Sequence, residues 1–300
     1  MSYKPICIDI SSQEKSKDIL STKNSVNFSS SQDYPLAQFG FQHFIHSLKN
    51  DTEKLKQFEN KKKVYQVMNP FERYIFDYNK SINDITNDYF KSKSQIVSRD
   101  FFKLWELILY LDLIDLEQNN FTTLHLSEIE GGFLQSCAYY REMFSKHHKN
   151  DKYYVHSDNN KIEINSKLKD YYKEQLPKDK VDFITADANL DNILENIQEE
   201  EYFKLLISHV INIINNQKKG GNSVCKLFET FTMTSLKILE IFRSLYNEVY
   251  IVKPLTSRPS VSEKYIVCKG FKSIDKKTID SLTEIQTSIN KSNLNIVDLF

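Results

Sequence analysis

The sequence predicts an α/β protein with a mostly parallel sheet, an antiparallel strand at one edge and a helical N-terminal extension. Between residues 96 and 272, short apolar runs alternate with helical stretches. This pattern is typical of right-handed crossovers and of a sheet covered on both faces. The last two runs are separated only by a turn, so we expect them to pair antiparallel at an edge. Residues 36–95 combine helical periodicity with dense charge, which predicts the extension.

The expected elements follow one another without an internal repeat. In chain order they are a helix over 100–116, a strand over 123–129, a helix from about 133, strands over 153–157 and 181–187, a helix over 195–217, a strand over 222–228, a helix over 232–246, and strands over 249–252 and 265–268. Only six glycines occur, and four of them form the pairs Gly131-Gly132 and Gly220-Gly221. Each pair indicates a place where the backbone needs unusual dihedral angles or a close approach.

We therefore divide the chain into three parts. Residues 1–95 comprise a flexible arm, rich in Ser, Lys, Asn and Gln over 10–33, and the helical extension. Residues 96–272 form the α/β domain. Residues 273–300 form a C-terminal helical tail, with one helix and an irregular end.

The composition excludes several classes of protein. Lys plus Arg and Asp plus Glu both number 40, so a nucleic-acid site would be a local basic patch on a neutral protein. The four cysteines are scattered, which argues against a disulfide framework or a zinc ribbon and for a reducing compartment. No signal-peptide pattern is recognised at the start of the sequence, and the most apolar segment, LWELILYLDLIDL, contains three acids. We expect a soluble, cytoplasmic protein that spans no membrane and has no metal site.

The first candidate site follows the strand over 123–129. In open α/β sheets, ligands bind outside the carboxyl ends of the strands. The strand delivers Glu128 there, and a turn with Gly131 and Gly132 comes next. The turn lacks the patterns GK[ST] and GxGxxG, so it is not a phosphate loop, and an acid at a strand end suits a ligand with ammonium or hydroxyl groups. A tight turn without a ligand is the alternative.

Four charged residues are expected to converge near that turn. One strand ends in Asp187, and Lys226 lies within the next apolar strand, although lysine is almost never buried without a partner. Glu263 precedes the last strand, and Lys103 lies in the first helix. Two lysines and two carboxylates in one cleft would be electrically balanced and would tune one another's proton affinity. A structural salt bridge between Lys226 and Asp187 is the alternative.

Five segments follow one another along the chain, and both their sequences and their order are informative: SRDFFKLWEL, HLSEIEGGF, DFITAD, GGNSVCKLFETF and KPLTSRPSVSEKYIVCKGF. They resemble the motifs of the FtsJ-like (RrmJ-type) ribose 2′-O-methyltransferases, and most closely those of the branch that methylates mRNA caps. The resemblance covers about residues 96–272. It implies a Rossmann-like fold that binds S-adenosylmethionine and transfers its methyl group to a ribose 2′-hydroxyl of RNA, at the cap-proximal nucleotide of mRNA.

The resemblance also implies roles for individual residues. Those that match the catalytic tetrad of the family are Lys103, Asp187, Lys226 and Glu263. Those expected to bind the cofactor are Glu128, Gly131, Gly132, Phe133, Asp187 and, by position only, Asp158. The chain departs from the family at Glu130, where proline is usual, and this departure bears on the shape of the turn.

By the resemblance, Lys226 is the general base that removes the proton of the 2′-hydroxyl. A free lysine, with a pKa of about 10.4, is protonated at neutral pH. Burial and the cation of Lys103 must therefore favour the neutral amine, while Asp187 and Glu263 orient it. The basic residues expected to contact RNA beside the tetrad are Arg99, Lys253, Arg258 and Lys264.

Two other functions fit the same motifs. One is 2′-O-methylation of ribosomal or transfer RNA, and the other is a non-catalytic RNA-binding subunit of a capping complex, against which the complete tetrad argues. The expected partner is RNA, in particular capped mRNA, and the N-terminal extension is a candidate contact for other capping or transcription subunits. Abundant Lys, Asn and Ile fit an AT-rich genome, such as that of a protist or of a large cytoplasmic DNA virus. A viral protein would act in the virion or in a viral factory.

Overall fold

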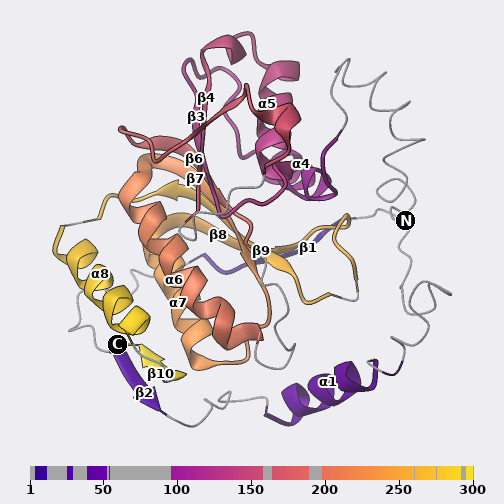
Figure 1. The fold of residues 1–300 in the computed structure, drawn as a ribbon, viewed down its shortest axis with the longest axis vertical. Coiled ribbons are helices and arrows are strands. Elements are labelled where there is room, and N and C mark those ends of the chain that lie inside the picture. Colours follow the sequence, from indigo (N-terminus) through magenta and orange to yellow (C-terminus); the bar gives the residue numbers. More distant parts are fainter. Residues whose placement is uncertain are drawn as a thin grey trace.

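The computed structural model describes residues 4–11, 26–29, 39–52, 54, 96–157, 164–188, 198–259, 261–274, 276–291 and 295–299. Its strands are β1 (Ile6–Asp9), β2 (Val26–Ser29), β3 (Thr122–Leu126), β4 (Lys152–His156), β5 (Tyr172–Glu174), β6 (Val181–Ala186), β7 (Gln217–Leu227), β8 (Tyr246–Lys253), β9 (Lys264–Phe271) and β10 (Asn295–Leu299). Its α-helices are α1 (Phe39–Thr52), α4 (Asp100–Leu111), α5 (Gly132–Phe144), α6 (Gln198–Asn216), α7 (Met233–Leu245) and α8 (Lys276–Lys291) (Figure 1).

The parallel part of the main sheet confirms the predicted α/β architecture. Eight strands lie in the order β1-β8-β9-β7-β6-β3-β4-β5, and the last five of these, from β7 to β5, run parallel. Every strand expected between residues 96 and 272 is present. The outermost strand, β5, was not expected, because its sequence, YKE, contains no apolar run.

The opposite edge differs from the prediction in one strand. β9 lies between β7 and β8 and runs antiparallel to both, which confirms the antiparallel pairing of the last two strands. However, the edge itself is β1, which pairs antiparallel with β8 and brings Ile8 opposite Ile251. A four-residue strand next to a polar segment carries too short a pattern to reveal its partner. The sheet is therefore not confined to residues 96–272.

Helices cover both faces of this sheet (Figure 1). Residues of α6, α7 and α8 form one buried apolar cluster, and residues of α4 and α5 form the other. In α4, the buried side chains of Phe101, Leu104 and Ile108 recur at helical spacing and give the helix one apolar side. The helix ends at Asp112, which adopts a left-handed φ of 53°, and so it is shorter than the predicted span over 100–116.

The C-terminal tail forms a helix, as expected, but its end is not irregular. Leu282, Ile285 and Ile289 of α8 are buried in the core cluster that α6 also lines. β10 then pairs antiparallel with β2, a strand inside the segment predicted to be a flexible arm. The predicted regions that lie outside the described residues are 12–25 and 30–33 of the arm, 36–38, 53 and 55–95 of the helical extension, and Asp158.

Two further observations concern the whole of the described chain. Within the described ranges, no helix combines the length and the apolar character that a membrane crossing requires. The four cysteines are free thiols, and three of them, Cys137, Cys225 and Cys268, are buried. Burial raises the pKa of the Cys225 thiol well above its usual value, so the buried thiols behave as small apolar side chains.

Candidate active site

Lys226 and Asp187 form the centre of a charged cluster at the carboxyl ends of the parallel strands. Ala186 of β6 lies opposite Cys225 of β7, so the residues that follow them, Asp187 and Lys226, come together. Lys226 Nζ lies 2.7 Å from Asp187 Oδ1, and the two side chains are only 1% and 5% exposed. Because both charges are buried, each needs the other as its partner.

Glu263 reaches this pair from the loop between β8 and β9. Lys226 lies opposite Tyr265 of β9, and Glu263 precedes Tyr265 by two residues. Glu263 Oε2 lies 4.0 Å from Lys226 Nζ. Tyr265 OH donates a hydrogen bond to Glu263 Oε1 at 3.0 Å and lies 3.5 Å from Asp187 Oδ1. The phenol therefore lies between the two carboxylates of the predicted tetrad.

Helix α4 supplies the second lysine of the cluster. Lys103 Nζ lies 2.8 Å from Glu263 Oε1 and 2.6 Å from Asp100 Oδ1. Asp100 and Lys103 are three residues apart, so their side chains lie on the same side of the helix. All four predicted tetrad residues therefore meet, and Asp100, which the sequence analysis did not assign to the site, joins them.

The glycine turn between β3 and α5 brings α4 to the site. Gly131 has a left-handed φ of 92°, which a residue with a side chain rarely adopts. A Cβ atom at Gly132 would clash with Ser98 Oγ and would lie 2.9 Å from the backbone nitrogen of Phe101. Glycine at this position therefore allows the start of α4 to pack directly on the start of α5.

Glu128 holds the N-terminus of α5. Its carboxylate accepts hydrogen bonds from the backbone amides of Phe133 and Leu134, which the positive end of the helix dipole reinforces. The Phe133 side chain is fully buried, and its ring lies against that of Tyr265 with 5.8 Å between the centroids. Of these two predicted cofactor-binding residues, only Glu128 also faces an open space.

That open space is a cavity of about 420 Å³. The described residues that line it are Arg99, Asp100, Lys103, Glu128, Ile129, Glu130, Gly132, Asp187 and Glu263. Five of these nine are acids, against one arginine and one lysine. The lining therefore has a surplus of negative charge and suits a cationic ligand. The described predicted site residues that are not part of the lining are Gly131, Phe133, Lys226, Lys253, Arg258 and Lys264. Lys226 contacts the lining through Asp187, at 2.7 Å.

The protein environment shifts the pKa values of the two tetrad carboxylates, Asp187 and Glu263, in opposite directions. Burial raises the pKa of Asp187 to about 7, although the Lys226 ammonium acts in the opposite direction. Burial also raises the pKa of Glu128 to about 8, and Asp187 adds to the rise. For Glu263, the effect of burial is outweighed by Lys103 and Lys226, and the pKa falls to about 2. Glu263 is therefore ionised at neutral pH, whereas Asp187 gains and loses its proton near neutrality.

Two of the predicted RNA-binding residues hold loops in place. Lys253 Nζ donates hydrogen bonds to Ser257 Oγ at 3.1 Å and to the Glu263 carbonyl at 2.6 Å. Burial lowers the pKa of Lys253 to about 8. Lys264 donates a hydrogen bond to the carbonyl of Phe228, in the loop that follows β7. These contacts could not be predicted from the sequence, because the carbonyl that a lysine reaches depends on the folded loop. An RNA contact stays a prediction for both lysines.

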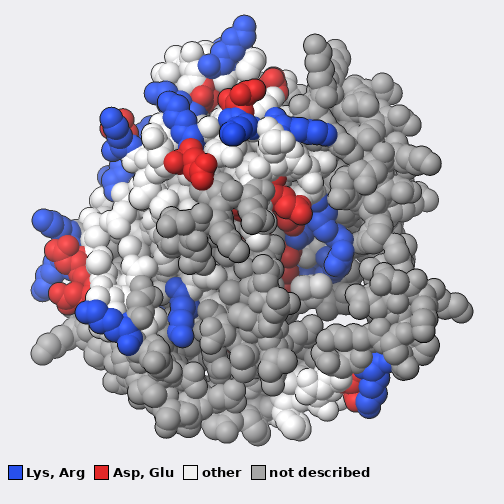
Figure 2. All heavy atoms as spheres, viewed as in Figure 1, with Lys and Arg blue, Asp and Glu red and all other residues white. Residues whose placement is uncertain are grey.

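The two arginines differ in their surroundings. Arg99 lines the cavity and donates a hydrogen bond to the Thr256 carbonyl at 3.2 Å, and Arg258 is exposed in the β8–β9 loop. Glu106 of α4, which the sequence analysis did not assign a role, anchors this loop by accepting hydrogen bonds from the amides of Leu255 and Thr256 at 2.8 and 3.0 Å. On the face drawn in Figure 2, the described Lys and Arg side chains are scattered among Asp and Glu side chains.

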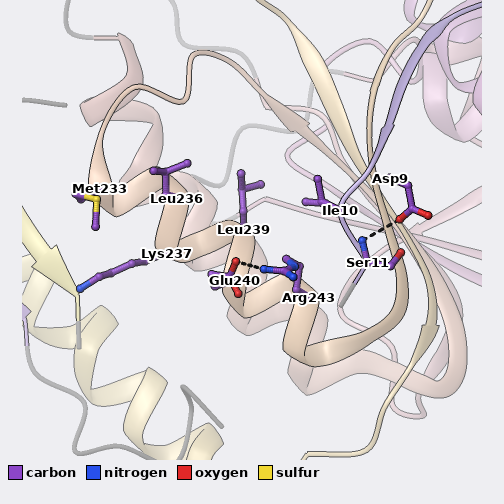
Figure 3. A pocket seen from close by; sticks show the side chains of 9 residues that line it. All are labelled: Asp9, Ile10, Ser11, Met233, Leu236, Lys237, Leu239, Glu240 and Arg243. Carbon is purple, nitrogen blue, oxygen red and sulfur yellow. Dashed lines mark hydrogen bonds and ion pairs between the residues drawn. The ribbon is translucent and has the colours of Figure 1, made fainter. Parts of the chain in front are cut away.

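A larger hollow, of about 550 Å³, lies between the end of β1 and helix α7 (Figure 3). Apolar side chains such as Ile10 and Leu236 line part of it, and Glu240 forms an ion pair with Arg243 on its α7 side. No tetrad residue lines this hollow, so the smaller cavity is the candidate active site. Throughout the described part of the chain, no three His, Cys, Asp or Glu side chains are grouped to hold a metal ion.

The segment that carries the cluster matches the model of a known protein family. The match is to FtsJ-like methyltransferase and covers residues 96–271, more than half of the chain. The chain belongs to the FtsJ-like methyltransferases. Members of this family use S-adenosylmethionine as methyl donor, and the fold expected from the motifs is thereby confirmed.

Three curated relatives of this FtsJ-like methyltransferase carry the name cap-specific mRNA (nucleoside-2′-O-)-methyltransferase 1. The protein from Dictyostelium discoideum is 34% identical over 105 residues, which are 35% of this chain and 14% of that protein. The Mus musculus protein is 35% identical over 111 residues, 37% of this chain and 13% of that protein. The Homo sapiens protein is 29% identical over 127 residues, 42% of this chain and 15% of that protein. The chain thus corresponds to a small part of each relative.

Among solved structures, a ribosomal RNA methyltransferase from Plasmodium falciparum overlaps with 59% of this chain and all of its own, at 19% identity and a TM-score of 0.44. That similarity is too distant to bear on function.

The cavity itself bears on the cofactor, because S-adenosylmethionine carries a sulfonium and an ammonium group. The acids of the lining suit both cations even though burial leaves Glu128 largely protonated at neutral pH, and Glu130, in place of the usual proline, is one of these acids.

Proposed function

We propose that this FtsJ-like methyltransferase transfers a methyl group from S-adenosylmethionine to a ribose 2′-hydroxyl of RNA, at the cap-proximal nucleotide of mRNA. The observation that carries the proposal is the convergence of Lys103, Asp187, Lys226 and Glu263 beside one acidic cavity. A purely structural ion pair would need no such cavity and no second lysine. A cytoplasmic site of action, expected from the free cysteines, belongs to the same proposal.

Methyl transfer to a 2′-hydroxyl places two requirements on the protein. When bound, the cofactor supplies an activated methyl group on its sulfonium. The protein must align the attacking oxygen with that group and accept the proton that the oxygen loses. Residues from three separate parts of the chain line a common space, namely Arg99 just before α4, Gly132 at the start of α5 and Glu263 in the β8–β9 loop, and this arrangement supports the alignment.

Lys226 accepts the proton in this proposal, and Asp187 makes it able to do so. Burial raises the pKa of Asp187 to about 7, so this carboxyl loses its proton near neutrality, 2.7 Å from Lys226 Nζ. Transfer of a proton from Lys226 Nζ to the ionised Asp187 across this contact leaves the amine able to take the proton of the 2′-hydroxyl. We expect the transfer rate to rise with pH through about 7.

Glu263 and Lys103 position the reacting groups. Glu263 stays ionised, because Lys103 and Lys226 lower its pKa to about 2, and it fixes the Lys103 ammonium at 2.8 Å. The ammonium is thus held as a permanent cation near the developing negative charge of the 2′-oxygen, where it favours the transition state. Tyr265 of β9 donates a hydrogen bond to the Glu263 carboxylate and so helps to hold it in place.

Two observations support the substrate assignment. The curated relatives are named as cap-specific mRNA methyltransferases, and the motifs around the tetrad resemble those of the cap-methylating branch of the family. The test is methyl transfer from labelled cofactor to short RNAs of one sequence, with a methylated cap, with an unmethylated cap or without a cap. We expect labelling of capped RNA to exceed that of uncapped RNA at least tenfold. Equal labelling of uncapped RNA would remove the cap assignment and favour ribosomal or transfer RNA. Tight RNA binding without any labelling would favour a non-catalytic subunit.

A further inference from the structure

Asp100 is a charged residue of the cavity that the tetrad does not include. Its Oδ1 atom lies 2.6 Å from Lys103 Nζ, and its side chain is 21% exposed, against 6% for Lys103. The Lys103 ammonium is therefore shared between Asp100 and Glu263. Burial alone would lower the pKa of Lys103, yet the two carboxylates raise it above that of free lysine. The ammonium stays charged throughout the working pH range.

A simpler role must be separated from a catalytic one. Asp100 is the first residue of α4, where an acid stabilises the helix dipole, and it forms an i,i+3 ion pair such as many helices carry. Such a pair would affect stability only. Two features set Asp100 apart, namely its position in the cavity lining and the identity of its partner, a tetrad lysine.

The charge count of the site depends on Asp100. The tetrad by itself contains two lysines and two carboxylates and would be balanced. The charged groups that face the same space from the surrounding elements are Arg99 just before α4, Lys103 of α4, Glu128 and Glu130 between β3 and α5, Asp187 after β6, which contacts Lys226 of β7, and Glu263 of the β8–β9 loop. Asp100 adds to the effect of burial in raising the pKa of Asp187 and of Glu130. Its charge therefore acts across the cavity.

We propose that Asp100 is a positioning residue that shares the Lys103 ammonium with Glu263 and sets the pH at which methyl transfer begins. The inference rests on the proposed function. Asp100, 2.6 Å from Lys103 Nζ, adds an anion beside the cavity that favours retention of the Asp187 proton, so transfer begins at a higher pH than a balanced tetrad would allow. The same charge attracts the cationic cofactor into the cavity.

The test is the pH dependence of the transfer rate at saturating cofactor, measured from pH 5.5 to 9 on the RNA that the wild-type protein labels best. In Asp100→Asn, the midpoint moves toward acid by about 0.5 to 1 pH unit. The rate at about pH 6 is then roughly three- to tenfold higher than in the wild type, which no merely structural defect produces. Asp100→Glu restores the carboxylate and returns the midpoint toward the wild-type value.

The matched control is Glu240→Gln, which removes a carboxylate from another i,i+3 helix pair, Glu240 and Arg243 of α7 (Figure 3). This control leaves the midpoint unchanged. An Asp100→Asn profile that superimposes on the wild-type profile overturns the inference and leaves the proposed function standing. If the wild-type protein labels no RNA, the proposed function fails instead. Calorimetric titration with S-adenosylmethionine over the same pH range then tests Asp100 separately, because the midpoint of cofactor affinity must show the same acid shift.

Discussion

Two groups of buried charges in this protein differ in what surrounds them. Near the C-terminal end of α5, the Arg141 guanidinium and the Asp151 carboxylate are both fully buried. Arg141 Nε lies 2.7 Å from Asp151 Oδ2, and other guanidinium nitrogens donate to the carbonyls of Asp115 and Gln118 at 2.7 and 2.8 Å. At the carboxyl ends of the strands, the second group consists of two lysines with three acids beside a cavity.

The difference shows how burial can serve either stability or chemistry. A guanidinium matches a carboxylate in two parallel hydrogen bonds, and Arg141 makes two such bonds to Asp151. A lysine can lose its proton, and a surplus of acids beside it shifts the pH at which this happens. The cavity then gives a ligand access to the second group only. We expect substitutions in the first group to affect folding and those in the second to affect transfer.

The largest effect is expected for Lys226→Met. Loss of the proton acceptor should reduce methyl transfer by about 10³-fold or more, roughly 4 kcal/mol in activation free energy. Cofactor affinity should stay within about threefold of the wild type, because Asp187, whose pKa is already raised to about 7, can take up a proton when it loses its partner. Single-turnover labelling and calorimetry measure the two quantities.

The control for Lys226→Met is Lys218→Met in the same strand, at a side chain that is 55% exposed and paired with Asp182. It should transfer methyl groups at the wild-type rate. Turnover of Lys226→Met close to that of this control would remove Lys226 as the base and would make the second group structural, like the first.

Arg141→Gln should produce the second-largest effect, and on stability instead of chemistry. It leaves the Asp151 carboxylate buried without its cation, which should lower the free energy of unfolding by about 3–5 kcal/mol. Urea unfolding measures the loss. In the double variant Arg141→Gln/Asp151→Asn the loss should be smaller, because no unpaired charge remains. A single-variant loss below about 1 kcal/mol would contradict a structural role for this pair.

Tyr265→Phe should cause a moderate loss of activity. The phenol donates to Glu263 and lies between the two tetrad carboxylates, so its removal should lower kcat about tenfold, or about 1.4 kcal/mol, with little change in the KM for the cofactor. Tyr246→Phe is the matched control, since that phenol is equally buried but bonds to Gln217 at 3.4 Å. Equal kcat values in the two variants would show that Tyr265 only fills space.

The smallest effect at neutral pH is expected for His125, whose influence on stability develops only in acid. His125 is fully buried between Thr123 and Thr185, and burial lowers its pKa to about 3. An unfolded histidine binds a proton below about pH 6.5, whereas the folded one does not until about pH 3. This residue therefore reduces stability as the pH falls from 6.5 toward 3, by about 1.4 kcal/mol per pH unit.

The measurement is the difference in unfolding free energy between the wild type and His125→Gln, followed from pH 6.5 to 4.5. Asp187 and Glu128, whose raised pKa values make acid stabilising, are present in both proteins. Glu128 Oε2 lies 3.6 Å from His125 Nδ1, so the difference reports on His125 together with this contact. From pH 6.5 to 4.5, the unfolding free energy of the variant should fall less steeply with decreasing pH than that of the wild type, by about 1.4 kcal/mol per pH unit. Parallel slopes would show that the imidazole is protonated in the folded state.

Sequence alone predicted the central sheet and the tetrad for a physical reason. Long apolar runs such as VDFITA and the strand register they impose bring Asp187 and Lys226 to one edge, and these features are local in the chain. β1 and β10 were missed, because strands of four and five residues with distant partners carry little periodic signal.

The charges around the tetrad were predictable only in part. In the sequence, Asp100 is indistinguishable from an ordinary acid at a helix N-terminus. Only the fold shows that Asp100 and Glu263 contact the same lysine, Lys103. The expected balance of two lysines and two carboxylates therefore omitted one acid. Lys253 and Glu106 were likewise not assigned as loop anchors, because the oxygens and amides they contact belong to a turn whose shape the sequence does not specify.

The most direct test of the central claim is the chemical position of the transferred methyl group. Wild-type protein is incubated with methyl-labelled cofactor and capped RNA, the product is digested with nucleases that cannot cleave beside a 2′-O-methylated ribose, and the fragments are identified by mass. The account predicts that the label lies on the ribose of one cap-proximal nucleotide, in a resistant fragment that Lys226→Met does not form. Label on a base, or the same resistant fragment with Lys226→Met, would contradict it.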